Sequence, residues 1–170
     1  MTLRAYITNL GKYNEGELVG QWVDFPCDED EFEDILQEIG VDGEQYEEWF
    51  VTDYECDIDE VAQELGEYVS LDELNRVAEA LEDWDEGLGE AVINIWGIDT
   101  LLNSTPDDYL WFEANDDEDI GYYYAEEFGI LDEVPANLRN YFDYEAYGRD
   151  IRLDTDSGLS DNGYFVERVG

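Results

Sequence analysis

The stretch Asp28–Gly40, DEDEFEDILQEIG, carries the pattern that decides the fold class. From Phe32 onward its apolar residues recur at i, i+3, i+4 and i+7, which is the spacing of one face of an α-helix. Asp28 can cap the first turn, with Glu31 three residues on as in a capping box, and Gly40 stands where a helix stops. The other face is almost entirely acidic, so the sequence predicts an amphipathic helix whose solvent side carries unbalanced negative charge.

Strand-like segments flank this helix. Leu3–Thr8 and Leu18–Phe25 precede it, and Asn14–Gly16 supplies turn residues between them. Tyr46–Tyr54 follows the helix and is rich in aromatic and β-branched residues, which strands favour. A helix among such strands predicts a small α+β module over residues 1–56.

Residues 57–103 carry helical signals throughout. An apolar stripe runs from Ile58 to Leu65, and Ser70 with Glu73 has the spacing of a capping box. Two further apolar segments, at 88–96 and 98–102, complete a predicted all-helical module.

The last third of the chain, residues 104–170, has mixed signals and is predicted to be a second α+β module. Pro135 suits the start of a helix because its missing N–H is not needed there. The other predicted elements are a strand at Tyr109–Phe112, a helix at Ile120–Phe128, and a closing pair of strands at Ile151–Leu153 and Tyr164–Val166.

The charge of this chain is extreme and unevenly distributed. Against 48 acidic residues there are 7 basic ones, which leaves a formal net charge of −41. Between Lys12 and Arg76 lie 23 acidic residues, and between Arg76 and Arg139 lie 18 more, with no Lys or Arg in either stretch. From Arg139 onward, 7 acidic residues face 4 basic ones. Ordinary helices interleave Lys with Glu for stability, so a feature other than folding favours this layout.

Such a charge restricts the possible partners. Nucleic acid and anionic membranes would be repelled, whereas basic grooves that normally hold DNA would attract the chain. B-DNA carries one charge per about 1.7 Å, so 41 charges correspond to roughly 70 Å, or about 20 base pairs. The chain therefore matches the charge of a DNA segment of comparable size, and we expect no direct nucleic-acid binding.

Composition indicates a folded protein of the cytoplasm. The 25 aromatic residues and 44% hydrophobic content are foreign to disordered acidic tails. No apolar run is long enough to span a membrane, and the chain begins directly with a strand-like pattern rather than a signal peptide. Cys27 and Cys56 are far apart, have no metal-site spacing, and are expected to be small buried residues.

The sequence offers little for catalysis or cofactors. With no histidine, the imidazole-based triads and metal sites are excluded, and among 48 acids a pair of carboxylates is no signal. We therefore expect neither an enzyme nor a cofactor. Asn115, Asp117, Asp119 and Glu126 match an EF-hand-like spacing, but Ile120 stands where the calcium loop requires glycine. A calcium-binding protein, a chaperone or buffer of basic proteins, and adaptation to high salt are the alternatives that composition leaves open.

Several segments resemble the ArdA family of antirestriction proteins. They are LRAYITNLGKYNEGELVGQW at 3–22, GEYVSLDELN at 66–75, VPANLRNYFDYEAYGRD at 134–150 and DNGYF at 161–165. The resemblance implies an elongated chain of three small domains from a mobile element, whose dimer looks like bent B-form DNA. It also implies competitive binding to the DNA groove of type I restriction–modification enzymes, at the methyltransferase core.

The resemblance places residues 137–150 in a motif linked to antirestriction and self-association. This motif is rich in aromatic residues and lies where the sequence is least acidic, so repulsion between two copies is lowest there. Interface cores are enriched in aromatic residues and depleted of charged ones. The predicted homodimer interface consists of Leu138, Tyr141, Phe142, Tyr144 and Tyr147.

The carboxylates of the first two modules and of the start of the third are predicted to stand in for phosphates. They are Asp28, Glu29, Asp30, Glu31, Glu33, Asp34, Glu44, Glu47, Glu48, Asp53, Glu55, Asp57, Asp59, Glu60, Asp72, Glu73, Glu79, Glu82, Asp83, Asp85, Glu86, Asp107, Asp108, Asp116, Asp117, Glu118, Asp119, Glu126 and Glu127.

Overall fold

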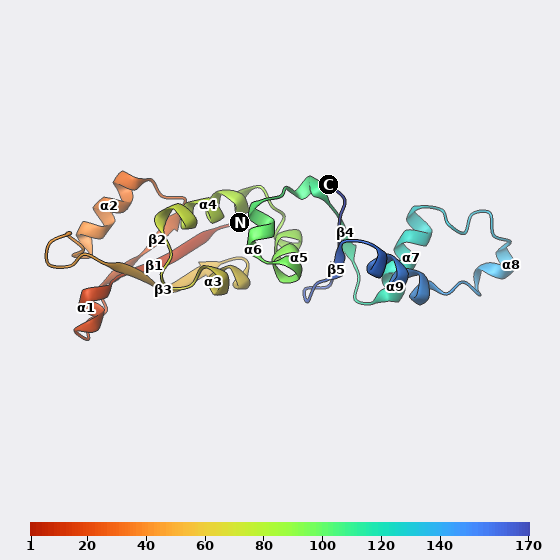
Figure 1. Cartoon of the computed structure of the whole chain (residues 1–170), viewed down its shortest axis with the longest axis horizontal. Coiled ribbons are helices and arrows are strands. Elements are labelled where there is room, and N and C mark those ends of the chain that lie inside the picture. The colour runs from red at the N-terminus through yellow and green to blue at the C-terminus, as the bar shows by residue number, and fades with distance from the viewer.

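The structure, a computed structural model, describes all residues 1–170 and is an elongated α+β chain (Figure 1). Its accessible surface of 9895 Å² exceeds the roughly 8,600 Å² expected for a compact monomer of this mass. The N-terminal sheet lies toward one end and helix α8 at the other, while both termini lie near the middle. The α+β class predicted from the sequence is confirmed.

An antiparallel sheet of order β2-β1-β3 forms the N-terminal part of the chain. Strand β1 (Leu3–Asn9) pairs on both sides, with β2 (Gly20–Phe25) and β3 (Trp49–Cys56). Short helix α1 (Leu10–Asn14) follows β1, and the side chain of Asn9 caps it by accepting a hydrogen bond from the Lys12 backbone. The predicted turn is found directly after this helix, at Glu15 and Gly16.

Helix α2 (Glu29–Glu38) confirms the prediction made from its amphipathic pattern. The Asp28 carboxylate accepts a 2.8 Å hydrogen bond from the Glu31 backbone N–H and caps the helix. Gly40, with φ of +83°, follows the last turn in a conformation that a side chain would disfavour. Phe32 is buried and its ring contacts those of Phe25 and Trp49, which fixes the acidic face outward.

Four helices follow in the predicted helical stretch. They are α3 (Asp59–Leu65), α4 (Leu71–Glu82), α5 (Glu86–Trp96) and α6 (Ile98–Leu102). The predicted capping box is present, since the Ser70 hydroxyl accepts from the Glu73 backbone and the Glu73 carboxylate accepts from that of Ser70.

One continuous core of 26 buried residues extends from Leu3 through the helices to Val166. The Asn75 side chain on α4 joins the first two segments by accepting from the Cys27 N–H and donating to its carbonyl, both at 2.8 Å. Asn94 on α5 forms a similar pair with Asp161, which ties the helices to the C-terminal part. The division into modules 1–56, 57–103 and 104–170 stays a prediction. Buried residues from all three ranges belong to the same core.

The C-terminal part combines a second antiparallel sheet with a helix pair. The sheet has the order β4-β6-β5, and a buried cluster of Ala114, Ile120 and Phe165 lies beneath it. Its elements are η1 (Pro106–Asp108), β4 (Tyr109–Glu113), α7 (Asp117–Glu127), α8 (Ala136–Arg139), α9 (Tyr144–Asp154), β5 (Ser157–Leu159) and β6 (Tyr164–Arg168).

The predicted strand at Ile151–Leu153 was wrong, because these residues form the last turns of helix α9. The Asp143 carboxylate caps this helix by accepting from the Ala146 backbone, and Ile151 packs against the small C-terminal cluster. The strand that closes the sheet is β5 instead, while the predicted strand at Tyr164–Val166 is confirmed within β6.

Helices α7 and α9 cross with their backbones almost in contact. A side chain at Gly121 would overlap the Tyr144 carbonyl, and one at Gly148 would overlap the Asp117 carbonyl. Two glycines thus let the helices approach more closely than any other residue would allow.

We predict that Gly148→Ala destabilises the protein by about 3 kcal/mol, since the added methyl group meets rigid backbone. Gly89→Ala on α5 is the matched control, because the nearest atoms there are the flexible methyl ends of Ile58 and Met1 at 3.2 and 3.3 Å. The control should lie within about 1 kcal/mol of the wild type. Urea unfolding followed by circular dichroism measures both, and equal midpoints for the two variants would contradict the close crossing.

Candidate partner-binding surface

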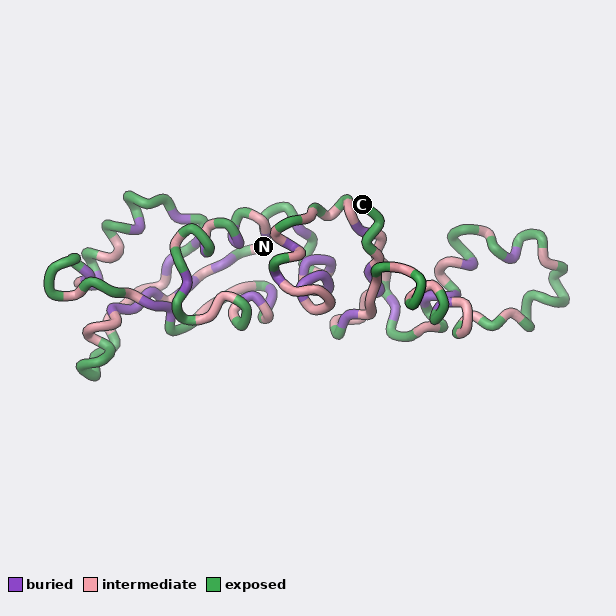
Figure 2. The backbone as a smooth tube through the Cα atoms, in the orientation of Figure 1, coloured by how far each residue is buried: buried purple, intermediate pink, exposed green.

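All acidic side chains of this chain lie at the surface. The buried polar residues are Thr8, Asn9 and Ser160, and no carboxylate is among them. Figure 2 shows exposed residues along the whole length of the chain, with the buried stretches mostly in the strands and helices. All predicted phosphate-mimicking residues are exposed except Glu60, Asp108 and Asp117, which are half-buried.

Some of these carboxylates also hold helices in place. Asp28, Asp85 and Asp116 each occupy an N-cap, where the side chain accepts backbone N–H groups of the first turn. The positive end of the helix dipole stabilises a negative charge at that position. All three carboxylates are exposed, so each can serve both the fold and a partner.

Few cations neutralise this surface. Among the predicted carboxylates only Glu55, at 2.8 Å from Arg4, and Asp117, at 2.7 Å from Arg152, belong to ion pairs. Lys12 pairs with Glu17 at 3.6 Å, and the Arg76 guanidinium donates a hydrogen bond to Asn103. Most of the negative charge is therefore free to act on a partner.

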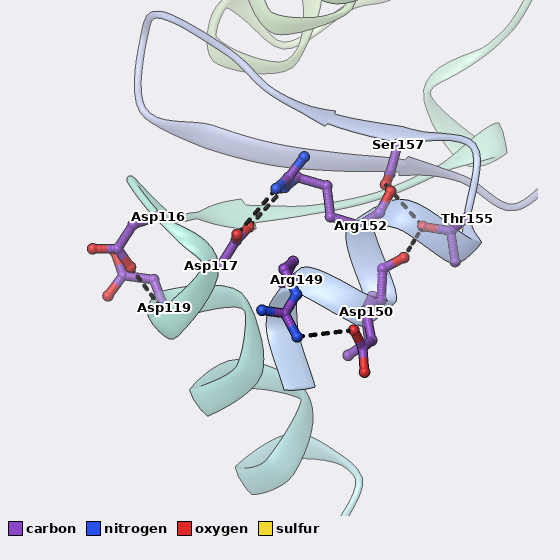
Figure 3. Close-up of polar contacts among 9 residues, drawn as sticks. Asp116, Asp117, Asp119, Arg149, Asp150, Arg152, Thr155 and Ser157 are labelled. Carbon is purple, nitrogen blue, oxygen red and sulfur yellow. Dashed lines mark hydrogen bonds and ion pairs between the residues drawn. The ribbon is translucent and has the colours of Figure 1, made fainter. Parts of the chain in front are cut away.

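Asp117 is the least suitable phosphate mimic of the predicted set. Figure 3 shows the Arg152 guanidinium on α9 directed at the Asp117 carboxylate on α7, with bonds of 2.7 and 3.0 Å to its two oxygens. The hydrogen bonds from Arg152 lower the pKa of the Asp117 carboxyl and raise the pKa of the guanidinium. Its charge is already balanced, and its role is to hold the two helices together.

Several exposed acids belong to the same surface although the prediction omitted them. Glu38 and Glu64 are exposed on helices α2 and α3, whose other acidic residues were included, and Asp99 is exposed on α6, from which no residue was included. The Asp42 carboxylate accepts three backbone N–H bonds, from residues 44 to 46, which lower its pKa and keep it ionised. Helical spacing alone would have identified the three helical residues, whereas the Asp42 loop has no periodic signal.

The predicted dimer residues lie at the end of the molecule opposite the N-terminal sheet, around α8 and the start of α9 (Figure 1). Tyr141 is 84% exposed and Leu138 is 50% exposed. The Phe142 ring is half-buried and contacts the rings of Tyr144 and Tyr147 at 5.1 and 5.4 Å. Phe128 and Ile130, which the prediction omitted, add further exposed apolar area nearby along the chain.

The cysteines are not activated nucleophiles. Cys27 is buried as expected, and burial raises its pKa to about 11. Cys56 is only half-buried rather than fully buried, and burial again raises its pKa. Both thiols are therefore protonated at neutral pH, when a nucleophile would need to be a thiolate.

No helix has the length and apolar character that a membrane span requires.

An elongated α+β body covered with unpaired carboxylates defines a protein whose surface suits basic partners. A protein-family model described as antirestriction protein (ArdA) matches residues 5–166. The chain therefore belongs to the ArdA family of antirestriction proteins, as its sequence resemblance indicated. Antirestriction implies interaction with restriction–modification enzymes. No individual curated protein matches the chain significantly.

We predict that Asp117→Asn lowers the free energy of unfolding by about 1 kcal/mol at pH 7. Because the folded state lowers the pKa of Asp117, its contribution is complete above the ordinary value of about 3.9 and is lost as the pH falls below it. The difference between variant and wild type should thus be constant from pH 7 to pH 5 and smaller at pH 3. Urea unfolding at these pH values measures it.

Glu118→Gln provides the matched control in the same helical turn, since Glu118 is exposed and forms no ion pair. Its effect should be smaller than that of Asp117→Asn at pH 7. A pH-independent difference for Asp117→Asn would show that the ion pair contributes nothing.

Proposed function

We propose that this protein is a DNA mimic, without catalytic activity, that occupies the DNA-binding groove of type I restriction–modification enzymes. The observation that carries the proposal is the exposure of nearly all predicted carboxylates along an elongated body, with almost no cation among them. A groove built to hold phosphates presents Lys and Arg side chains, which attract such a surface.

The proposed mechanism is competition with DNA at the methyltransferase core. Carboxylates from α2 to α7 take the places of phosphates, so protein and DNA cannot be bound together. Long-range attraction accelerates association, and salt weakens it as it weakens DNA binding. The protein acts in the cytoplasm, where these enzymes meet incoming DNA.

Calcium binding is the weaker alternative. Of the acids with EF-hand-like spacing, Asp117 is engaged through both oxygens by Arg152, and Asp119 accepts the backbone N–H of Asn115. A cation at this position would have to displace the arginine first.

The test is competition for a type I methyltransferase core bound to labelled duplex DNA, measured at two salt concentrations. We expect stoichiometric displacement of DNA, with an apparent affinity that falls steeply as salt rises. DNA that stays bound at both salt concentrations would refute the proposal.

Single neutralising substitutions should have little effect in this assay. Each exposed carboxylate contributes about 0–1 kcal/mol, so Asp30→Asn or Asp59→Asn should weaken inhibition by less than about five-fold. A sharp loss from one of these changes would contradict a distributed charge surface.

We also propose that the chain forms a homodimer through Leu138, Tyr141, Phe142, Tyr144 and Tyr147. Exposed apolar residues gather at one end, where the sequence is least acidic and repulsion between two copies is smallest. A dimer joined there would extend the acidic surface over two chain lengths.

Tyr141→Ala is expected to raise the dimer dissociation constant at least ten-fold, because a central exposed aromatic residue often dominates an interface. Tyr68→Ala is the matched control, since Tyr68 is 75% exposed on the N-terminal part of the chain. Sedimentation velocity over a range of concentrations measures both. An unchanged dimer in Tyr141→Ala would place the interface elsewhere.

A further inference from the structure

A recess of about 540 Å³ lies on the N-terminal part of the chain and takes no part in the fold's core. It is formed by strands β1, β2 and β3 together with α1 and the segments that follow α1 and α3. Half of its lining residues are aromatic and two are carboxylates: Tyr6, Tyr13, Leu18, Trp22, Phe50, Thr52, Asp53 and Glu67.

The alternation of strand β1 places this recess on the outer face of the sheet. Leu3, Ala5 and Ile7 point into the core and are at most 1% exposed, so Arg4 and Tyr6 lie on the opposite face. The pairing register sets Tyr6 between Trp22 on β2 and Asp53 on β3. Aromatic side chains here cover a face that would ordinarily be polar.

The rings are held by contacts with one another. Tyr6 and Trp22 meet edge to face at 5.4 Å, and Tyr13 and Phe50 do so at 5.1 Å. Even so, Tyr13 remains 50% exposed and Leu18 remains 64% exposed. The recess is therefore pre-formed, and part of its apolar lining faces water.

The same face already binds a cation within the chain. The Arg4 guanidinium lies 5.3 Å from the centre of the Trp22 ring. It pairs with Asp24 at 2.6 Å and with Glu55 at 2.8 Å, and these hydrogen bonds raise its pKa. On this sheet, an aromatic ring and two carboxylates thus already bind one arginine side chain of the protein itself.

The neighbouring recess repeats that composition without a cation of its own. It shares Trp22 with the Arg4 site and adds further rings, and Asp53 and Glu67 supply the two carboxylates. Both carboxylates are exposed, neither is in an ion pair, and no Lys or Arg lines the recess.

We propose that this recess binds the guanidinium group of an arginine side chain from the protein partner. A guanidinium is planar and weakly hydrated, stacks on aromatic rings and pairs with carboxylates, so it fits both parts of the lining. The proposal deepens the proposed function, because a DNA-binding groove is rich in arginine. DNA has no such recess, so this contact would add specificity that phosphate mimicry lacks.

The first test uses a probe that needs no partner. The intact protein is titrated with N-acetyl-arginine amide at constant ionic strength, and the Trp22 indole resonance is followed by NMR. The lysine and norleucine amides serve as comparisons. We expect saturable shifts of Trp22, tightest with arginine, weaker with lysine and absent with norleucine. Equal binding of norleucine, or no saturable shift with arginine, would overturn the proposal.

Two variants test the two parts of the lining. Tyr13→Leu keeps apolar volume but removes a ring, and should weaken arginine amide binding about two- to five-fold. Asp53→Asn with Glu67→Gln should weaken it more. The charge-matched control is Glu133→Gln with Asp154→Asn, two exposed acids outside the recess and outside the partner-binding surface, and it should bind like the wild type. A loss in the control equal to that in the recess variant would overturn the proposal.

The DNA-displacement assay then distinguishes the two hypotheses. If the wild type displaces DNA and Tyr13→Leu does so at least two-fold less well, the recess contacts the partner. If both displace DNA equally, the recess takes no partner arginine and this inference is overturned while the proposed function stands. If the wild type fails to displace DNA, the proposed function is refuted. The inference that the recess binds an arginine of that partner is then refuted as well.

Discussion

Repulsion among carboxylates is the constraint on which the rest of this structure depends. A net charge of −41 on 170 residues cannot be placed in a low-dielectric interior, and every carboxylate is at the surface. An elongated shape separates these charges and exposes more area per residue than a compact one. An elongated protein cannot concentrate its apolar residues in one central core. Its parts are instead connected by one continuous cluster of buried apolar residues along the molecule.

In most proteins lysine side chains stabilise helices and connect segments through ion pairs. Here hydrogen bonds of capping aspartates and of asparagine side chains have that role. Helices begin at aspartates such as Asp28 and Asp116, so the same charge that repels its neighbours stabilises a helix dipole. Asn75 and Asn94 connect segments with neutral amide groups, which neither add to the charge nor reduce it. The pair of Asp117 and Arg152 is one of the few places where a cation is used, and it joins two helices that meet on glycine.

Aromatic residues divide into three uses. Phe32 and Trp84 are buried in the core, while Tyr141 and its neighbours gather where the chain is least acidic. Tyr6 and Trp22 lie on the outer face of the first sheet, where Tyr13 of α1 joins them beside the carboxylates of Asp53 and Glu67. Rings present a negative face, so they add to the attraction for cations without adding formal charge. Selection by a partner can therefore rest on shape and stacking as well as on total charge.

The sequence by itself determined the fold class, most of the helices and strands, and the acidic surface. Periodic signals, caps such as Ser70 and the absence of bases between Lys12 and Arg76 are local properties of the chain. Only the tertiary structure decided that Ile151 lies in a helix, because a short apolar run fits either structure until its packing partners are known. It also decided that Asp117 is neutralised by an arginine 35 residues away and that Tyr6, Trp22 and Asp53 share one recess. Such groupings arise from strand register and helix crossing, which join residues that no spacing in the sequence connects.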